Sequence, residues 1–259
     1  MQNASRELLD AEAAMCDDRH VAHTRFTVGR DSIAVGVNTE NDWVDHLTLE
    51  ELTRIWTFEA TGTVTRWNDI RSEWPDERLH LHGRDSGSGT FDYFTTAIGD
   101  GRGDIRDDYS ATSQTDEIWD AVAGNRYALG WGPLGHLRSL QDLGGTLRTV
   151  PVESDEEPGT TYEPTQEHVE SGKYSPLSRP LYLFVNHDQL ADRPDLIGSF
   201  LRFTFNGQLS FARAVGFFGT QPDGVATNHE RLNGLLETLG VRDEVSVGIE
   251  QDGEYEIDT

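Results

Sequence analysis

The chain has 259 residues and a formal net charge of −25 at pH 7, because 46 acidic residues outnumber 21 basic ones, of which Lys173 is the single lysine. Nucleic acids and anionic membranes repel such a surface, so the composition argues against both as partners. The hydrophobic content of 36%, with six Trp and eleven Phe, excludes a disordered acidic chain and is enough for a sizeable core.

An acidic surface with so little lysine is typical of a protein made for high salt, where screening shortens the reach of like-charge repulsion. The single cysteine, Cys16, excludes an internal disulfide and a multi-cysteine metal site, and its simplest interpretation is a small buried apolar residue. The sequence has no run of ~18 apolar residues of the kind that spans a bilayer. Residues 1–6 have no apolar core, so no signal peptide is visible.

Hydrophobic periodicity and capping residues predict helices that alternate with strands. Ser5 is the candidate N-cap of the first helix, and Thr48 caps another in which Glu51 completes a capping box. In chain order, the expected elements are a helix over 6–17, a strand over 32–37, a helix over 48–58, a strand over 78–82, helices over 91–98 and 116–124, strands over 127–132 and 146–152, a loop over 153–159, a strand over 181–186, helices over 193–205 and 232–239, and a frayed acidic end over 250–259.

This alternation favours an α/β fold, with helices flanking a sheet. Residues 31–38 and 179–186 have the same form, a polar start and an apolar run that ends in Val-Asn. Two such strands would be paired crossings between two lobes, with the chain between them forming one lobe and the two chain ends the other. Chance similarity between buried strands is the alternative.

A short loop of small residues is the most informative feature of the chain. It precedes the helix over 91–98, and a helix start carries unpaired N–H groups and the positive end of the macrodipole. Hydroxyls and a guanidinium add further donors, and glycines let a ligand approach the backbone. The loop therefore suits a tetrahedral oxyanion such as phosphate, although a solvent-exposed turn is the alternative. Its residues are Arg84, Asp85, Ser86, Gly87, Ser88, Gly89 and Thr90.

Other chemistry is less well supported by the sequence. His80 and His82 lie on one strand face but lack a carboxylate at ligand spacing, so an ordinary strand edge is favoured over a metal site. The glycine spacing around Ser88 is wrong for a nucleophile elbow, and the chain has no Gly-Lys-Ser/Thr of a Walker loop. An enzyme acting on phosphate esters through Ser88 and Arg84 would need a base or metal nearby, and the local sequence offers no convincing one.

The order of several motifs resembles the phosphate-binding proteins of phosphate ABC importers, within the periplasmic binding protein superfamily. The resemblance covers roughly residues 2–240, and the acidic composition makes the chain similar to a haloarchaeal member. The motifs that carry it are Ala4-Ser5-Arg6, Leu47-Thr48-Leu49-Glu50-Glu51-Leu52 with Ile55-Trp56, Thr65-Arg66-Trp67-Asn68-Asp69, Arg84 to Thr90, and Ser178-Arg179-Pro180-Leu181-Tyr182.

This resemblance implies two α/β lobes joined by hinge strands, the first formed by 1–33 and 186–259 and the second by 34–185, with a ligand cleft between them. It implies no catalysis, no cofactor and a monomer that captures inorganic phosphate outside the cell, at its surface, and delivers it to an ABC permease. The second lobe would hold phosphate through Arg84, Ser86, Gly87, Ser88, Gly89 and Thr90, and the first through Ser5 with Arg6 nearby. A receptor for sulfate, molybdate or tungstate, and a truncated form that binds nothing, are the alternatives.

The sequence departs from the family pattern in two respects. The secretion signal and the Gly-Ser-Ser/Thr loop that usually begin the first lobe are missing, so we expect the chain to start inside that lobe and to lack part of it. Some relatives have a carboxylate that accepts the proton of hydrogen phosphate and so rejects sulfate. Arg6 and Ser86 occupy two such places here, which leaves Asp85 as the candidate proton acceptor.

Overall fold

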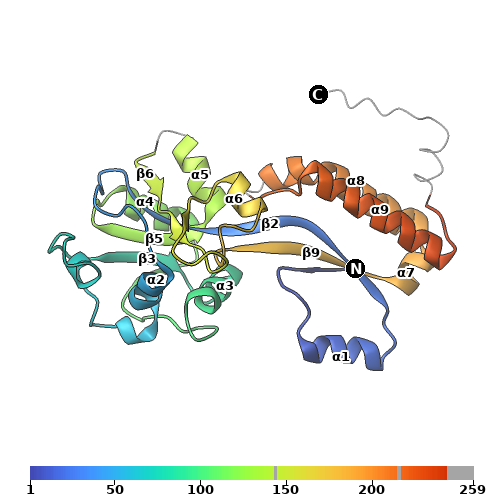
Figure 1. Ribbon diagram of the computed structural model, residues 1–259, viewed down its shortest axis with the longest axis horizontal. Coiled ribbons are helices and arrows are strands. Elements are labelled where there is room, and N and C mark those ends of the chain that lie inside the picture. Colours follow the sequence, from blue (N-terminus) through green and yellow to red (C-terminus); the bar gives the residue numbers. More distant parts are fainter. Residues whose placement is uncertain (143–144, 215–216, 244–259) are drawn as a thin grey trace. The chain divides into compact units, whose positions relative to one another are not determined.

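The computed structural model describes residues 1–142, 145–214 and 217–243, which form two compact units (Figure 1). Unit 1 comprises residues 1–30, 180–214 and the described residues from 218 onward, and unit 2 comprises residues 31–179 with Phe217. The division falls within two strands, β2 (His23–Asn38) and β9 (Ser178–Asn186). The expected α/β architecture is confirmed. Within the described ranges, none of the helices combines the length and the apolar character that a bilayer crossing requires.

Unit 2 is built on a mixed sheet. The second half of β2 pairs antiparallel with β5 (Ala128–Pro133) and with β6 (Leu147–Thr149). On its other side β5 pairs parallel with β3 (His80–Arg84), which in turn pairs parallel with β4 (Ser110–Thr112). The helices of this unit are α2 (Leu49–Trp56), α3 (Gly89–Ile98), α4 (Thr115–Ala123), α5 (Leu134–Asp142) and α6 (Gln166–Glu170), with 3-10 turns at Phe58–Ala60 and Trp67–Asp69 and a short pair of strands, β7 (Val152–Glu153) and β8 (Thr161–Tyr162).

Buried aromatic rings hold α3 against this sheet. Trp131 on β5 stacks on Phe94 of α3, with 4.0 Å between the ring centroids and 11° between the planes. Trp56 of α2 meets Trp131 edge-on, at 6.2 Å and 89°. All three side chains are fully buried, and aromatic contacts of this kind add to the apolar area they bury. The start of α3 is therefore attached to the core of unit 2.

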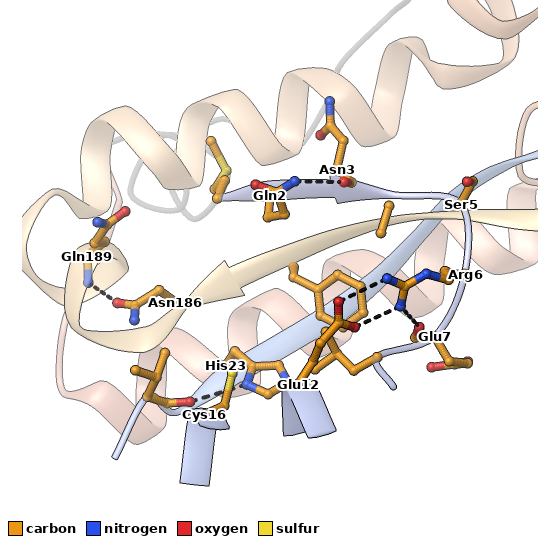
Figure 2. A pocket seen from close by; sticks show the side chains of 15 residues that line it. Gln2, Asn3, Ser5, Arg6, Glu7, Glu12, Cys16, His23, Asn186 and Gln189 are labelled. Carbon is orange, nitrogen blue, oxygen red and sulfur yellow. Dashed lines mark hydrogen bonds and ion pairs between the residues drawn. The ribbon is translucent and has the colours of Figure 1, made fainter. Parts of the chain in front are cut away.

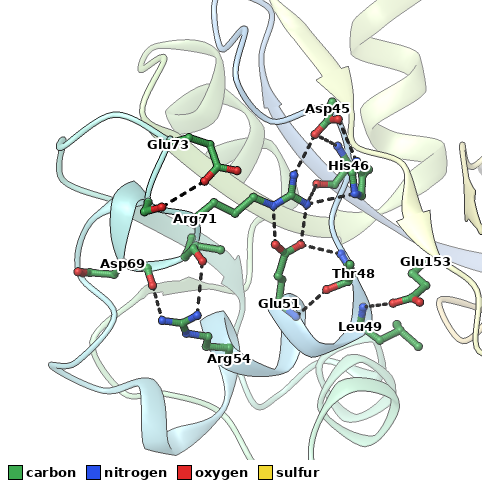
Figure 3. A network of polar contacts seen from close by, with 12 residues as sticks. Asp45, His46, Thr48, Leu49, Glu51, Arg54, Asp69, Arg71, Glu73 and Glu153 are labelled. Atoms are coloured by element: carbon green, nitrogen blue, oxygen red, sulfur yellow. Dashed lines mark hydrogen bonds and ion pairs between the residues drawn. The ribbon is translucent and has the colours of Figure 1, made fainter. Parts of the chain in front are cut away.

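A polar network anchors the residues before α2 (Figure 3). The Arg71 guanidinium donates to both carboxylate oxygens of Glu51, from Nε at 2.5 Å and from Nη2 at 2.9 Å, and also to Asp45 and to the carbonyl oxygen of His46. Glu51 in turn accepts from the N–H of Thr48, which completes the predicted capping box. The helix predicted over 48–58 is confirmed, and it ends earlier, at Trp56.

Unit 1 packs two long helices on strands. β9 lies between β1 (Gln2–Ala4), with which it pairs antiparallel, and β2. The helices are α1 (Asp10–Asp18), α7 (His187–Asp192), α8 (Pro194–Ala214) and α9 (Pro222–Leu239), of which α8 and α9 lie side by side (Figure 1). Their apolar faces meet residues of β2 and β9 in one core: Phe26, Leu183, Val185, Leu190, Ile197, Leu201, Phe205, Leu232, Leu235 and Leu236.

The prediction of the first helix was wrong at its start. Residues 2–4, for which no element was predicted, form β1, because they pair with Tyr182, Leu183 and Phe184 of β9. The helix begins at Asp10, and its N-cap is Leu9, whose N–H donates to Glu12 at 2.9 Å. Ser5 therefore caps no helix and lies in the loop between β1 and α1.

The strand predicted over 146–152 was also wrong as one element. It divides into β6 and β7 around Pro151, which has no N–H to donate to a ladder. The two C-terminal helices begin or end well outside their predicted bounds, since α8 runs to Ala214 and α9 begins at Pro222. The other predicted helices and strands are confirmed as to type, and the frayed end over 250–259 lies outside the described residues.

We expect Gly83→Ala to destabilise the protein by about 2 kcal/mol, because an added Cβ would meet Trp131 and overpack the core. A Cβ at Gly83 would lie 2.4 Å from Nε1 of that ring. Urea unfolding of the variant would measure the loss. Gly101→Ala is the matched control, since no atom lies within 4 Å of its added Cβ. An unchanged midpoint for Gly83→Ala would contradict the packing described here.

Candidate functional site

The loop 84–90 lies where β3 ends and α3 begins. The turn is closed by Asp85, whose side-chain Oδ1 accepts from the N–H of Gly87 at 3.2 Å and whose carbonyl oxygen accepts from the N–H of Ser88 at 3.2 Å. Ser88 then has the extended backbone of an N-cap, and its Oγ accepts from the N–H of Thr90 at 3.2 Å. Local hydrogen bonds of these residue types thus fix the loop.

The Arg84 guanidinium is held by uncharged acceptors. Its Nε donates to Ser88 Oγ at 3.2 Å, and its Nη1 donates both to the carbonyl oxygen of Ser113 at 2.5 Å and to Thr115 Oγ1 at 2.8 Å. Among the described residues, Nη2 has no hydrogen-bond partner and the guanidinium makes no ion pair. Its charge and two N–H groups therefore stay available to an anion.

Further donors of the loop are also uncommitted. Ser88 Oγ already accepts from Arg84 and from Thr90, so its own hydrogen is left to donate outward. Within the part of the chain that the structure describes, the N–H of Gly89 and the hydroxyl of Thr90 have no hydrogen-bond partner. Ser86, Gly87 and Gly89 are exposed, and no atom lies within 4 Å of a Cβ built on Gly89. The first turn of α3 thus presents backbone and side-chain donors to solvent.

Tyr109 is hydrogen-bonded to the first residue of the loop. Its hydroxyl donates to the carbonyl oxygen of Arg84 at 2.7 Å. Burial, and after it the negative charge of Asp85, raise the pKa of Tyr109 to about 12. The phenol therefore keeps its proton at neutral pH and stays a donor.

Ser5 and Arg6 belong to unit 1, where they line a cavity of about 520 Å³ (Figure 2). Both terminal nitrogens of Arg6 donate to Glu12, at 2.7 Å and 2.9 Å, and Nη1 also donates to the carbonyl oxygen of Glu7. The hydrogen bond from Arg6 is the main reason that the pKa of Glu12 falls to about 2. A carboxylate therefore compensates the charge of Arg6, which is not so for Arg84.

The structure brings the predicted residues 84–90 together in one loop of unit 2 and puts Ser5 and Arg6 in unit 1. Sequence reasoning missed Tyr109, Ser113 and Thr115, because their contacts with Arg84 cross 25 to 31 positions and no local pattern marks them. His80 and His82 lie on β3, and burial lowers the pKa of His82. In residues 1–142, 145–214 and 217–243, no group of three or more His, Cys, Asp or Glu side chains could hold a metal ion.

Comparison with known proteins identifies the family. Residues 2–208 match the model of the PBP superfamily domain. The chain is 36% identical to protein SphX of Synechocystis over 217 residues, which are 83% of this chain and 62% of SphX. It is 30% identical to the phosphate-binding protein PstS of Staphylococcus saprophyticus over 234 residues, which are 90% of this chain and 69% of that protein. The chain thus spans between about three fifths and seven tenths of the length of these two relatives.

A solved structure has the same fold. The crystal structure of a "possible phosphate binding protein" from Planctomyces limnophilus superposes with a TM-score of 0.75 and is 30% identical in sequence. The match covers 90% of this chain and 80% of that protein.

We expect Ser88→Ala to lower the free energy of unfolding by about 1 kcal/mol, because the N–H of Thr90 loses its cap. Urea unfolding without added anions would measure the difference. Ser86→Ala is the control, since Ser86 is exposed and makes no side-chain hydrogen bond within the described ranges. Equal stability of Ser88→Ala and the wild type would mean that the cap does not hold the start of α3.

Proposed function

This chain belongs to the PBP superfamily, and we propose that it is the phosphate-binding component of a phosphate ABC importer. It captures inorganic phosphate outside the cell, as a monomer, and delivers it to the membrane permease. The names of its relatives in Staphylococcus and Planctomyces support the ligand. The proposal keeps the lobes predicted from the sequence, 1–33 with 186–259 and 34–185, and assigns the loop 84–90 to the second.

One observation carries the proposal: within the described residues, several donors of this loop have no acceptor, and Arg84 has no carboxylate partner. Nη2 of Arg84, the hydroxyls of Ser88 and Thr90 and the N–H of Gly89 have hydrogens to donate, and no described carboxylate pairs with Arg84. A dehydrated phosphate would accept these hydrogen bonds, with Ser86 and Gly87 closing over it. Charge-assisted hydrogen bonds contribute about 1.5–3 kcal/mol each, which outweighs screened repulsion from distant carboxylates.

Asp85 is the proposed proton acceptor for hydrogen phosphate. One of its oxygens, Oδ1, is engaged by the N–H of Gly87, and Oδ2 has no hydrogen bond within the described residues. A free carboxylate oxygen facing sulfate would put two acceptors together, whereas hydrogen phosphate brings a proton. This role explains how the site would prefer phosphate to sulfate.

The contacts of Ser88 favour binding over catalysis. The two groups that donate to its Oγ are the guanidinium of Arg84 and the N–H of Thr90, and neither can serve as a base. In the described part of the chain, no imidazole or carboxylate is hydrogen-bonded to this hydroxyl. The protein is therefore proposed to release phosphate unchanged.

Calorimetric titration in molar salt tests the proposal. We expect phosphate to bind the wild type with measurable heat and sulfate to give none. Arg84→Ala should weaken phosphate binding about 10- to 100-fold, because it removes charge-assisted hydrogen bonds. The control is Arg78→Ala, which removes an exposed arginine a few residues earlier.

A folded wild type that releases no heat with phosphate would contradict the proposal. Heat with sulfate alone would identify a receptor for a different oxyanion. The same titration of Ser5→Ala and Arg6→Ala tests the predicted contacts of unit 1. Since Arg6 is already paired with Glu12, a loss in Arg6→Ala would require that pair to open on binding.

The net charge of the chain should affect the association rate of phosphate. Because −25 charges repel an arriving anion, the association rate of phosphate should rise severalfold from about 0.1 M to about 1 M salt, as the Debye length falls from about 10 Å to about 3 Å. Stopped-flow tryptophan fluorescence would measure it, with sucrose as a control for viscosity. A rate that falls steeply with salt would instead mean that a local positive field steers the ligand.

A further inference from the structure

A further inference comes from the contacts of Arg84 with the segment that joins β4 to α4. Nη1 is saturated by two acceptors that lie close together in sequence, the carbonyl oxygen of Ser113 and the hydroxyl of Thr115, and Nε is taken by Ser88. The carbonyl oxygen of Arg84 itself accepts from Tyr109. Three hydrogen bonds thereby hold the guanidinium at two of its nitrogens, Nε and Nη1, and Nη2 is the nitrogen that remains.

Sheet topology explains why this segment reaches Arg84. β3 and β4 run parallel, and Arg84 is in register with Thr112, the last residue of β4. Parallel strands that end together put their following loops side by side. The turn into α4 therefore lies beside the loop 84–90, and Thr115, the first residue of α4, is half-buried there.

Within the described residues, the acidic side chains of the loop 84–90 and of the first turn of α4 make no ion pair with Arg84. Glu117 accepts from the hydroxyl of Thr112 at 2.5 Å, and Asp116 pairs with His136 of α5. Asp85 accepts from the N–H of Gly87. In a chain with 46 acidic residues, Arg84 is thus held without a carboxylate among the described residues.

We propose that Thr115 is a positioning residue for the anion-binding arginine: with Ser113, it fixes the Arg84 guanidinium through neutral contacts, so that Nη2 faces the anion with its charge uncompensated. This inference rests on the proposed function, since it assigns how Arg84 is prepared for phosphate. A threonine hydroxyl orients the guanidinium without neutralising it, whereas an aspartate or glutamate at the same place would compete with the ligand.

Three substitutions at Thr115 separate these effects in calorimetric titration with inorganic phosphate. Thr115→Val keeps the shape and removes the acceptor, so affinity should fall about tenfold. Thr115→Ser keeps the hydroxyl, so affinity should stay within about twofold of the wild type. Thr115→Asp supplies a competing carboxylate, so affinity should fall more than about a hundredfold.

Thermal unfolding distinguishes a role of Thr115 in positioning Arg84 from a general role in stability, because only the second would lower the melting temperature together with the affinity. An aspartate in the first turn of α4 suits the helix dipole, so Thr115→Asp should be as stable as the wild type although it binds phosphate worst. The control is Thr112→Ser, which removes a methyl group from β4 but keeps the hydroxyl contacts with Glu117 and with the N–H of Gln114. Within the described residues, the Thr112 side chain makes no hydrogen bond with Arg84. The affinity of Thr112→Ser should match that of the wild type.

A double-mutant cycle completes the test. In the Arg84→Ala background, measured at millimolar phosphate, Thr115→Val should cause no further loss, because Thr115 acts through Arg84. A further loss there, or wild-type affinity in Thr115→Val or Thr115→Asp, would overturn the inference while leaving the proposed function standing. A wild type that fails to bind phosphate would overturn both.

Discussion

The parallel pairing of β3 with β4 and β5 is the constraint on which the rest of the site depends. Because these strands end at one edge of the sheet, the turn after β3 and the turn after β4 become neighbours. One turn brings Arg84 and Ser88, and the other brings Ser113 and Thr115. The stack of Phe94 on Trp131 then fixes α3 on the same sheet, so its first turn is anchored by the core. A change in this register would separate donor groups that no local interaction could bring together.

The charge distribution resolves an apparent contradiction. A chain of net charge −25 is a poor long-range attractor of anions, but screening confines that repulsion to the surface. Within the described residues, the acidic side chains of the loop 84–90 and of the first turn of α4 make no ion pair with Arg84. The affinity of such a site is decided by the groups within hydrogen-bond reach, while the overall charge affects the rate of encounter.

The sequence predicted what short-range chemistry decides. The capping box of Thr48 and Glu51 marks α2, and the Ser/Gly run marks the turn into α3, because both depend on residues a few positions apart. Sequence analysis failed where the structure of a segment depends on a partner far away in the sequence. Residues 2–4 form a strand because β9 offers its edge, and the first helix begins only at Asp10, where Glu12 accepts from the N–H of Leu9. The role of Thr115 was equally invisible, since its contact with Arg84 exists once β3 and β4 are paired.

Arg84 and Arg6 illustrate how far residue type alone can identify a binding group. Both are arginines beside small polar residues, and both were predicted to contact phosphate. Arg6 already donates from both terminal nitrogens to Glu12, so an anion that recruits it must first replace a paired carboxylate. Arg84 donates to neutral oxygens and keeps Nη2 unpaired within the described residues, so an anion there replaces water and gives up no ion pair. The difference lies in the neighbours that the fold supplies, and it makes Arg84 the better prepared of the two arginines.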